Sequence, residues 1–178
     1  MWNWGGIRRP VWLEITEPIR IDHQHITALP NLKDGTATIN GVFQLNNQRI
    51  TAEKVEFEWI ISKAGKEYWR SKRTTTTLSS QMETTQKLET KLPAVQGELW
   101  HFNTPHLYRS EVVLYQHGKE IQRLNDRFGI RKIEVDGYQL KLNGESIRPV
   151  GFNIVAEDRT SGNTLPLWRI KEDVDLDR

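Results

Sequence analysis

Pairs of histidines and carboxylates are the side chains of this 178-residue chain whose spacing could support chemistry. His23 and His25 are two residues apart, so in a strand both rings would lie on one face and could bind a metal ion. A zinc site needs three or four ligands, and no third ligand is marked by its spacing to this pair. We therefore expect two solvent-facing histidines near a sheet edge, with neither a metal ion nor a cofactor.

Glu56 and Glu58 would likewise share one face of a strand. That face lies opposite the apolar side chains of the same strand, where no enclosed pocket would shift a carboxyl pKa, so we predict a solvated pair. The chain has no cysteine, which excludes disulfides, thiolate nucleophiles and sulfur-ligated metals. It also has neither a phosphate-binding glycine loop nor a Gly-x-Ser-x-Gly elbow. We predict no catalytic residue.

Charge and hydropathy exclude two classes of partner. The chain has 25 basic and 23 acidic residues, a balance that does not favour nucleic-acid binding. Its apolar runs are far shorter than the roughly 20 residues that a membrane span needs, so we expect no membrane partner. The N-terminus lacks the apolar core of a secretory signal and leaves the localisation open. The densest basic cluster, expected to be a solvated hairpin face, comprises Lys63, Lys66, Arg70, Lys72 and Arg73.

The elements that would position these groups are strands, because apolar and polar residues alternate along most of the chain. Turn pairs such as Asp34-Gly35 and Asn143-Gly144 separate the alternating runs. The number and spacing of the runs are typical of an all-β fold, an immunoglobulin-like antiparallel β-sandwich. The fourth and fifth runs have few residues to bury and should be edge strands. The expected strands are 19–28, 35–45, 54–62, 67–76, 82–91, 107–116 and 119–132.

Large aromatic residues within these strands are predicted to form the structural core. Trp59 falls midway along the third strand, where a sandwich often buries a large ring. We assign Trp100, Tyr108 and Phe128 to the core as well. The seven tryptophans could instead stack on sugar rings, and an exposed row of Trp and Tyr on one sheet would favour that function. Only residues 166–176 have helical spacing, over a length that is marginal without a packing partner.

Three stretches together resemble glycoside hydrolase family 2, the family of β-galactosidases, β-glucuronidases and β-mannosidases. Residues 3–15 are similar to the end of the family's sugar-binding jelly-roll domain. The second stretch resembles the Trp-Pro-Leu-Tyr signature of the family's immunoglobulin-like domain. The third resembles the passage from that domain into the (β/α)8 barrel. The second stretch is Leu99-Trp100, Asn103, Pro105 and Leu107-Tyr108, and the third is 127–135 with Leu142-Asn143-Gly144 and Gly151-Phe152-Asn153.

The resemblance implies a fragment of a longer enzyme. Residues 1–14 would end the jelly-roll domain and 15–132 would form the sandwich. Residues 133–178 would form the entry hairpin, first strand and first helix of a truncated barrel. The family's acid/base and nucleophile glutamates come from later barrel strands, so this chain alone would not be an enzyme. The parent would be a retaining β-glycosidase, periplasmic, secreted or cytoplasmic in a bacterium, and the sandwich would be a spacer between the jelly-roll and barrel domains.

One motif departs from the family pattern. Many members carry Arg-His-Glu after Gly-Val-Asn, and the histidine contacts substrate, but Val155 stands in its place here. Asn153 is the one residue of the motif that we carry over as a contact of the carbohydrate substrate. Glu157 and Asp158 are further candidates, for which ordinary loop polarity is the alternative explanation. The alternative for the whole chain is a free-standing carbohydrate-binding or adhesion sandwich.

Overall fold

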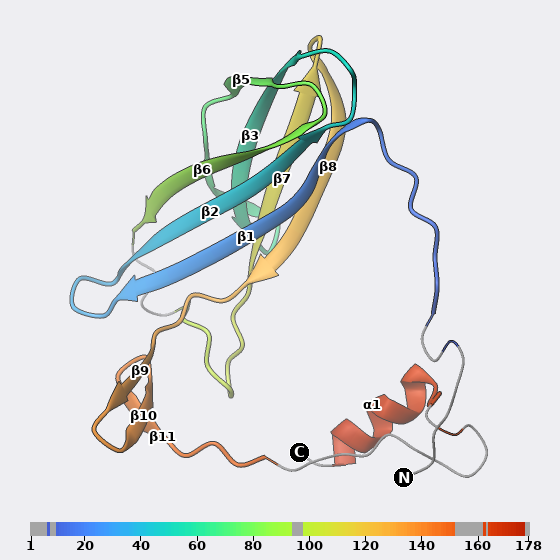
Figure 1. Ribbon diagram of the computed structural model, residues 1–178. Helices are drawn as coiled ribbons and strands as arrows, with labels where there is room; N and C mark the ends of the chain where they lie inside the picture. The colour runs from blue at the N-terminus through green and yellow to red at the C-terminus, as the bar shows by residue number, and fades with distance from the viewer. Residues whose placement is uncertain (1–6, 8–9, 94–97, 152–161, 163, 177–178) are drawn as a thin grey trace. The chain divides into compact units, whose positions relative to one another are not determined.

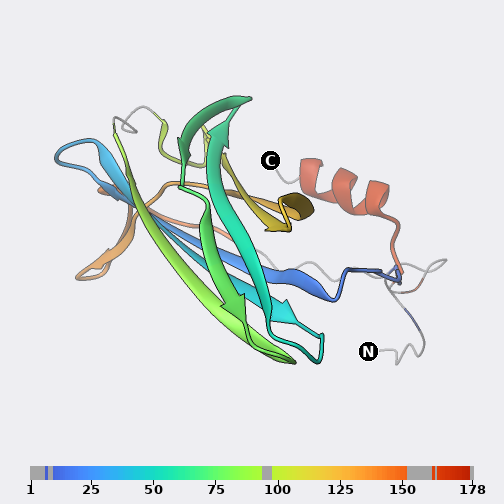
Figure 2. The ribbon, with the colours of Figure 1, turned by 90° about the horizontal axis from the view of Figure 1, so that it is seen from above.

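The chain forms two compact units, which are described separately. One unit is Thr16–Arg148, and the other combines Met1–Ile15 with Pro149–Arg178. In the larger unit two antiparallel sheets form the layers of a sandwich, as the ribbons of Figures 1 and 2 show. The computed structural model describes residues 7, 10–93, 98–151, 162 and 164–176.

The first sheet has three strands in the order β1-β2-β6. They are β1 (Ile19–Asn31), β2 (Thr36–Asn47) and β6 (Met82–Leu92). Residues alternate between buried and mostly half-buried along β2, because successive side chains of a strand point to opposite faces. The buried side chains of this sheet therefore face the second layer, while β1 and β6 lie at its edges.

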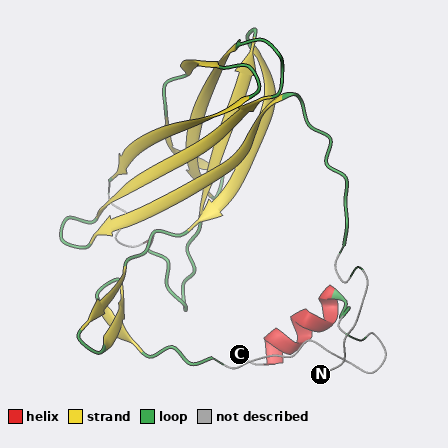
Figure 3. Ribbon diagram, viewed as in Figure 1, coloured by secondary structure: helices red, strands yellow, loops and turns green. Residues whose placement is uncertain are grey.

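The second sheet is built around β3 (Glu53–Lys63) and β7 (Tyr108–Gln116). The strand order is β4-β3-β7-β8, and β5 also pairs with β3. The outer strands are β4 (Lys66–Arg70), β5 (Thr74–Leu78) and β8 (Lys119–Phe128). All pairings are antiparallel, and Figure 3 shows strands throughout this unit.

The core between the sheets draws side chains from both layers. Phe43 on β2 lies edge-to-face with Trp59 on β3, with ring centroids 5.3 Å apart. The Trp59 indole Nε1 donates to Ser110 Oγ at 2.8 Å, and Ser110 Oγ donates to Gln24 Oε1 of β1 at 2.8 Å. An apolar core thus contains one line of polar contacts that joins β3, β7 and β1. The prediction of an all-β antiparallel sandwich is confirmed.

The predicted fourth strand, 67–76, is wrong as a single strand. The chain forms β4 against the C-terminal half of β3 and β5 against its N-terminal half. Ser71 lies between them and bonds Trp59 twice: its backbone N–H donates to Trp59 O at 2.8 Å, and its Oγ accepts from Trp59 N at 2.9 Å. Trp59 lies near the middle of β3, between the residues that pair with β5 and those that pair with β4. The segment 67–76 is therefore interrupted at Ser71. The prediction that the weakly apolar runs form edge strands is confirmed for β4, β5 and β6.

A small sheet follows the sandwich in sequence. It contains β9 (Ile133–Asp136), β10 (Gln139–Leu142) and β11 (Glu145–Ile147), in the order β11-β10-β9. The Asn143 side chain connects it to the sandwich, since its Oδ1 accepts from Lys132 N at 2.9 Å and its Nδ2 donates to Trp100 O at 3.0 Å. Residues 147–153 were expected to lead into the first barrel strand; 148–151 have no strand conformation, and 152–153 lie outside the described residues.

The smaller unit contains the single described helix, α1 (Leu167–Leu176). This confirms the helix expected over residues 166–176. Leu167 and Trp168 are exposed, whereas Leu165 just before the helix is buried. Among the residues that the structure describes, no helix has the length and apolar character needed to cross a membrane.

Candidate functional site

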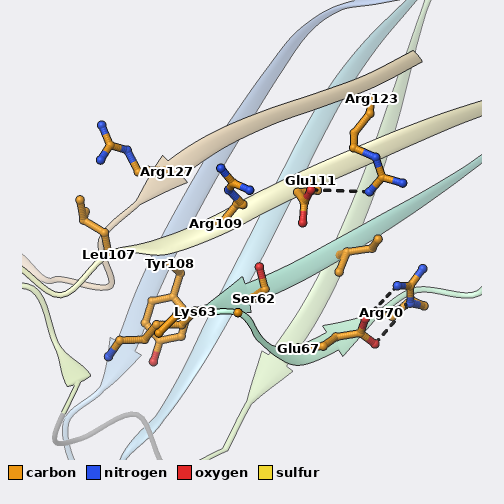
Figure 4. A pocket seen from close by; sticks show the side chains of 13 residues that line it. Ser62, Lys63, Glu67, Arg70, Leu107, Tyr108, Arg109, Glu111, Arg123 and Arg127 are labelled. Atoms are coloured by element: carbon orange, nitrogen blue, oxygen red, sulfur yellow. Dashed lines mark hydrogen bonds and ion pairs between the residues drawn. The ribbon is translucent and has the colours of Figure 1, made fainter. Parts of the chain in front are cut away.

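A charged hollow lies on the outer face of the second sheet and has a volume of about 470 Å³ (Figure 4). Its side chains come from β3, β4, β7, β8 and the turns beside them. Most of them point away from the core because alternate residues of each strand face outward, whereas Tyr108 is a core residue that borders the hollow. Its basic residues are Lys63, Arg70, Arg109, Arg123 and Arg127, and its acidic residues are Glu67 and Glu111.

The floor of this outer face is apolar. Ile60, Val113 and Tyr115 form a small buried cluster on the side of the sheet opposite the main core. Val113 is fully buried, although its strand faces solvent on this side. Charged side chains therefore cover an apolar base, so this outer face is a packed surface with ordered ion pairs.

Glu58 lies under this cover, which corrects the prediction of a solvated Glu56–Glu58 pair. The residue is 6% exposed, and its carboxylate accepts hydrogen bonds from Tyr115 Oη at 2.6 Å and from Arg70 at 3.0 Å. Burial, together with the hydrogen bond to Glu58, raises the pKa of Tyr115. Strand alternation placed Glu58 on the outer face, but it could not indicate that β4 and β7 bring an arginine and a tyrosine over it.

Three of the basic side chains in the hollow have carboxylate partners. Arg70 binds Glu58 and also Glu67, the latter at 2.8 Å. Arg123 contacts Glu120 at 2.8 Å and Glu111 at 3.5 Å. Lys63 pairs with Glu98 at 3.4 Å. Part of the basic cluster expected to form a solvated hairpin face is therefore held in ion pairs.

Arg109 and Arg127 are the other two basic residues of the hollow. They are directly opposite each other in the β7–β8 register, and both are exposed. Within the described ranges neither guanidinium group has a hydrogen bond or an ion pair, whereas each of the other three cations has at least one carboxylate partner. Excess positive charge is therefore concentrated at the end of the hollow beside Leu107.

Glu98 is held ionised by two tyrosines. Tyr108 Oη donates a hydrogen bond to it, and Tyr68 Oη donates another at 3.2 Å. The Tyr108 hydrogen bond and the nearby Lys63 ammonium keep the pKa of Glu98 below its ordinary value, against the opposing effect of burial. Burial is the main cause that raises the pKa of Tyr108, and the hydrogen bond to Glu98 adds to it. This environment favours a carboxylate that keeps its charge, which is the opposite of what a general acid requires.

The candidate residues taken from the sequence fall into three groups. Trp59, Tyr108 and Phe128 belong to the hydrophobic core. Trp100 is half-buried, and the Arg131 guanidinium lies 4.6 Å from the centre of its ring. The proposed substrate contacts Asn153, Glu157 and Asp158 lie outside the described residues.

Four of the described histidines lie in two separate places. His23 and His25 are both exposed on the edge strand β1. His101 lies 3.9 Å from Glu145, in a second hollow of about 490 Å³ that also contains His106. Over the described part of the chain, no group of three or more His, Asp and Glu side chains could hold a metal ion.

Comparison with known proteins gives one family. The sequence profile of the glycosyl hydrolases family 2 matches residues 19–131. A β-galactosidase of Klebsiella pneumoniae is 26% identical over 159 residues, which are 86% of this chain and 15% of that protein. A β-galactosidase of Lactococcus lactis subsp. lactis is 33% identical over 66 residues, which are 36% of this chain and 7% of that protein. The chain thus spans a small part of the length of the curated relatives it matches.

Solved structures show the same fold. A glycosyl hydrolase family 2 member from Bacteroides cellulosilyticus superposes with a TM-score of 0.78 at 24% identity, over 90% of this chain and 21% of the other. A β-galacturonidase of Eisenbergiella tayi bound to galacturonate gives 0.77 at 22% identity, over 90% and 27%. A β-glucuronidase of Bacteroides uniformis gives 0.75 at 21% identity, over 86% and 18%.

Proposed function

The chain belongs to the glycosyl hydrolases of family 2, and from this membership we propose that it is a non-catalytic segment of a retaining β-glycosidase. In this proposal the sandwich is a spacer between a sugar-binding jelly-roll domain and a (β/α)8 catalytic barrel. Those two domains are its partners, and the carbohydrate is bound and cleaved by the complete enzyme. The β-galactosidase names of both curated relatives support a β-glycoside as the substrate class.

The family match over residues 19–131 carries this proposal, and the state of the described carboxylates agrees with it. A retaining glycosidase needs two carboxyl groups about 5 to 5.5 Å apart, one of them with a raised pKa so that it can donate a proton. In the described ranges, every carboxyl group whose pKa departs clearly from its ordinary value has that pKa lowered, mainly by hydrogen bonds from hydroxyl or cationic side chains. These groups are Asp34, Glu67, Glu98, Glu120 and Asp136.

The proposed contacts with substrate come from the end of the chain. Asn153 occupies the position of the motif asparagine, and Glu157 and Asp158 follow it closely in sequence. We propose that they reach carbohydrate only when a complete barrel supplies the remaining strands. Their role therefore belongs to the full-length enzyme.

The alternative of a free-standing sugar-binding module would be favoured by an exposed aromatic row on one sheet. Among the described strands β1 to β8, Trp59 and Tyr108 are fully buried and Tyr115 is 8% exposed. Tyr68 and Trp69 on β4 are half-buried. The observation that would favour the alternative is therefore missing from both sheets of the sandwich.

Two measurements test the proposal. Purified chain incubated with aryl β-galactoside, β-glucuronide and β-mannoside should release no aglycone above a blank. Turnover that persists through repurification would contradict the non-catalytic assignment.

The spacer role is tested by a chimaera in which residues 15–132 replace the corresponding sandwich of the Klebsiella pneumoniae β-galactosidase. A spacer should leave KM within about threefold of the parent enzyme when the chimaera folds, since KM reports substrate contacts. A large change in KM with little change in kcat would show instead that the sandwich contributes to substrate binding.

A further inference from the structure

Arg109 and Arg127 break a rule of sheet construction. Their Cα atoms are paired across β7 and β8, so the two side chains leave the same face of the sheet next to each other. Like charges directly opposite in an antiparallel pair are destabilising. In the described part of the chain no carboxylate contacts either guanidinium to offset the repulsion. Violations of this kind without a structural compensation are expected at functional sites.

The row of paired residues that contains Arg109 and Arg127 includes a residue of a third strand. Ser62 of β3 is paired with Arg109 of β7, and Arg109 is paired with Arg127 of β8. The next outward-facing row of the sheet contains Glu111. Neighbouring strands lie about 4.8 Å apart, so a hydroxyl, two guanidinium groups and a carboxylate are spread over a patch roughly two strand spacings wide. Figure 4 labels these four side chains among those that line the hollow and joins Glu111 to Arg123 by a dashed line.

The chemistry of this row matches an acidic sugar. A guanidinium group presents its N–H groups in a planar fork that binds a carboxylate through two parallel hydrogen bonds. Ser62 Oγ can donate to or accept from a sugar hydroxyl, and Glu111 can accept from one. The volume of about 470 Å³ is within the usual range of small-ligand sites.

We propose that the outer-face hollow binds a monosaccharide-sized sugar acid, with its carboxylate on Arg109 and Arg127 and its hydroxyl groups on Ser62 and Glu111. The choice of a sugar rests on the proposed role in a carbohydrate-processing enzyme. The site lies on the sandwich and uses none of the residues assigned to substrate contact at the end of the chain.

An acidic peptide fits the hollow less well. Glu67 and Glu111 line it together with the arginines and would repel additional carboxylates of a polyanionic segment. The side chain of Glu111 is 19% exposed and that of Glu67 is 48% exposed, so both carboxylates can act on a ligand. A ligand with one carboxylate and several hydroxyl groups can place its carboxylate on the arginines and donate hydrogen bonds from its hydroxyl groups to the glutamates.

Binding is tested with the complete 178-residue chain by NMR titration of its amide resonances. The probes are sodium glucuronate, glucose, sodium acetate and sodium sulfate at constant ionic strength. Glucuronate should shift the resonances of residues 62, 109–111 and 127 along saturating curves, at least tenfold more tightly than glucose. Acetate and sulfate, which lack the sugar hydroxyls, should bind at least threefold more weakly than glucuronate.

The matched variants are R109Q/R127Q and K87Q/K119Q. Both remove two positive charges, and Lys87 and Lys119 are exposed lysines outside the hollow. The first pair should weaken glucuronate binding about tenfold or more, and the second should leave it within twofold. Loss of the repelling pair should also leave the urea midpoint of R109Q/R127Q equal to or above that of the parent chain. This midpoint shows that the variant is folded.

Three outcomes would overturn the proposal: equal responses to glucuronate and glucose, glucuronate binding that survives in R109Q/R127Q, or acetate or sulfate binding as tightly as glucuronate. The last result would identify a general anion site. None of these results depends on turnover by the parent enzyme. A failure here is thus distinct from a failure of the glycosidase assignment, which the aryl glycoside assay and the chimaera test.

Discussion

At the scale of single residues, Trp59 contacts both sheets of the sandwich, through its ring and through its N–H group. Its ring lies edge-to-face with Phe43 and with Trp69, at 5.3 Å in both cases. Its N–H begins the polar line through Ser110 to Gln24, which joins the two sheets. Trp59 thus combines a large buried side chain with a buried hydrogen bond.

Replacing Trp59 should therefore be costly. Trp59→Ala is expected to lower the free energy of unfolding by about 3 to 5 kcal/mol, because it removes a large buried ring and leaves a cavity. Trp59→Phe is the matched variant, since it keeps an aromatic ring and loses mainly the N–H contact with Ser110, and its loss should be smaller. Urea unfolding followed by circular dichroism measures both. An unchanged midpoint for the alanine variant would contradict the role of Trp59 as a core anchor.

Tyr108 gives a residue-scale prediction on pH. Burial above all raises its pKa from the ordinary value of about 10 in the folded chain. Its contribution to stability is therefore complete below pH 10 and is lost as the pH rises above 10, because only the unfolded chain then releases the proton. Tyr108→Phe should make the fall in stability above pH 10 shallower.

Urea midpoints between pH 8 and 11 measure this slope, with Tyr138→Phe as the control for the loss of an exposed tyrosine. Tyr68 and Tyr115 also have raised pKa values and should leave part of the slope in the Tyr108 variant. A Tyr108→Phe slope identical to that of the parent chain would mean that the phenol ionises as readily in the folded chain as in the unfolded one.

At the scale of elements, the edges of the two sheets are connected by side chains. The register of β1 with β2 shifts between Ile21 and His23. Gln122 of β8 contacts the backbone at this shift, since its Oε1 accepts from Ile21 N at 2.5 Å and its Nε2 donates to Ile21 O at 3.2 Å. One glutamine amide therefore satisfies the backbone groups that an irregular strand would otherwise leave without partners.

Gly129 follows β8 directly, and its lack of a Cβ atom leaves room for the Trp100 side chain. A Cβ atom at Gly129 would lie 2.8 Å from Trp100 Cβ and 2.9 Å from two atoms of its ring system. Gly129→Ala should therefore displace Trp100 and cost about 1 to 3 kcal/mol of unfolding free energy, as overpacking commonly does.

The matched control is Gly151→Ala, because no heavy atom outside its own chain neighbours lies within 4 Å of a Cβ built there. Urea midpoints and tryptophan fluorescence of the two variants measure the difference. Equal midpoints for Gly129→Ala, Gly151→Ala and the parent chain would show that the loop carrying Trp100 moves aside at no cost.

At the scale of the whole molecule, the two units differ in how much of their apolar surface is buried. The core of the larger unit contains 18 buried apolar residues from both sheets. In the smaller unit, Leu167, Trp168 and Val174 of α1 are exposed. A helix of 10 residues is marginal in water unless an apolar face packs on a partner.

Amide hydrogen exchange should therefore be slow in the sandwich and fast in α1. Amides of residues 54–62 and 107–116 should exchange slowly, because β3 and β7 lie at the centre of their sheet and open only when the sandwich unfolds. Amides of α1 should exchange at least a hundredfold faster, as expected of an element that opens locally. Mass spectrometry of peptic fragments measures both. Protection of α1 equal to that of β3 would show that the helix belongs to a self-contained domain and would favour the free-standing module.

The sequence by itself determined the class of the fold and the family. Period-two alternation reports which face each strand buries, so it predicted most strands, and the few apolar residues of the fourth and fifth runs predicted that these two lie at the edges. The Leu99–Tyr108 and 127–135 motifs indicated the family because they are local in sequence. The same local signals placed Glu58 on the outward face of its strand and Trp59 on the inward face, which is correct for both.

Only the tertiary structure decided what covers that outward face. Glu58 is buried by Tyr115, which is 57 residues away in sequence, and Arg109 meets Arg127 because β7 and β8 are paired in one particular register. Alternation fixes the face of a side chain but carries no information on its neighbours across strands. A one-residue change of register would replace all of them. The buried carboxylate and the pair of arginines without a described partner therefore exist only in the folded sheet, and the proposed acidic-sugar site rests on that pair of arginines.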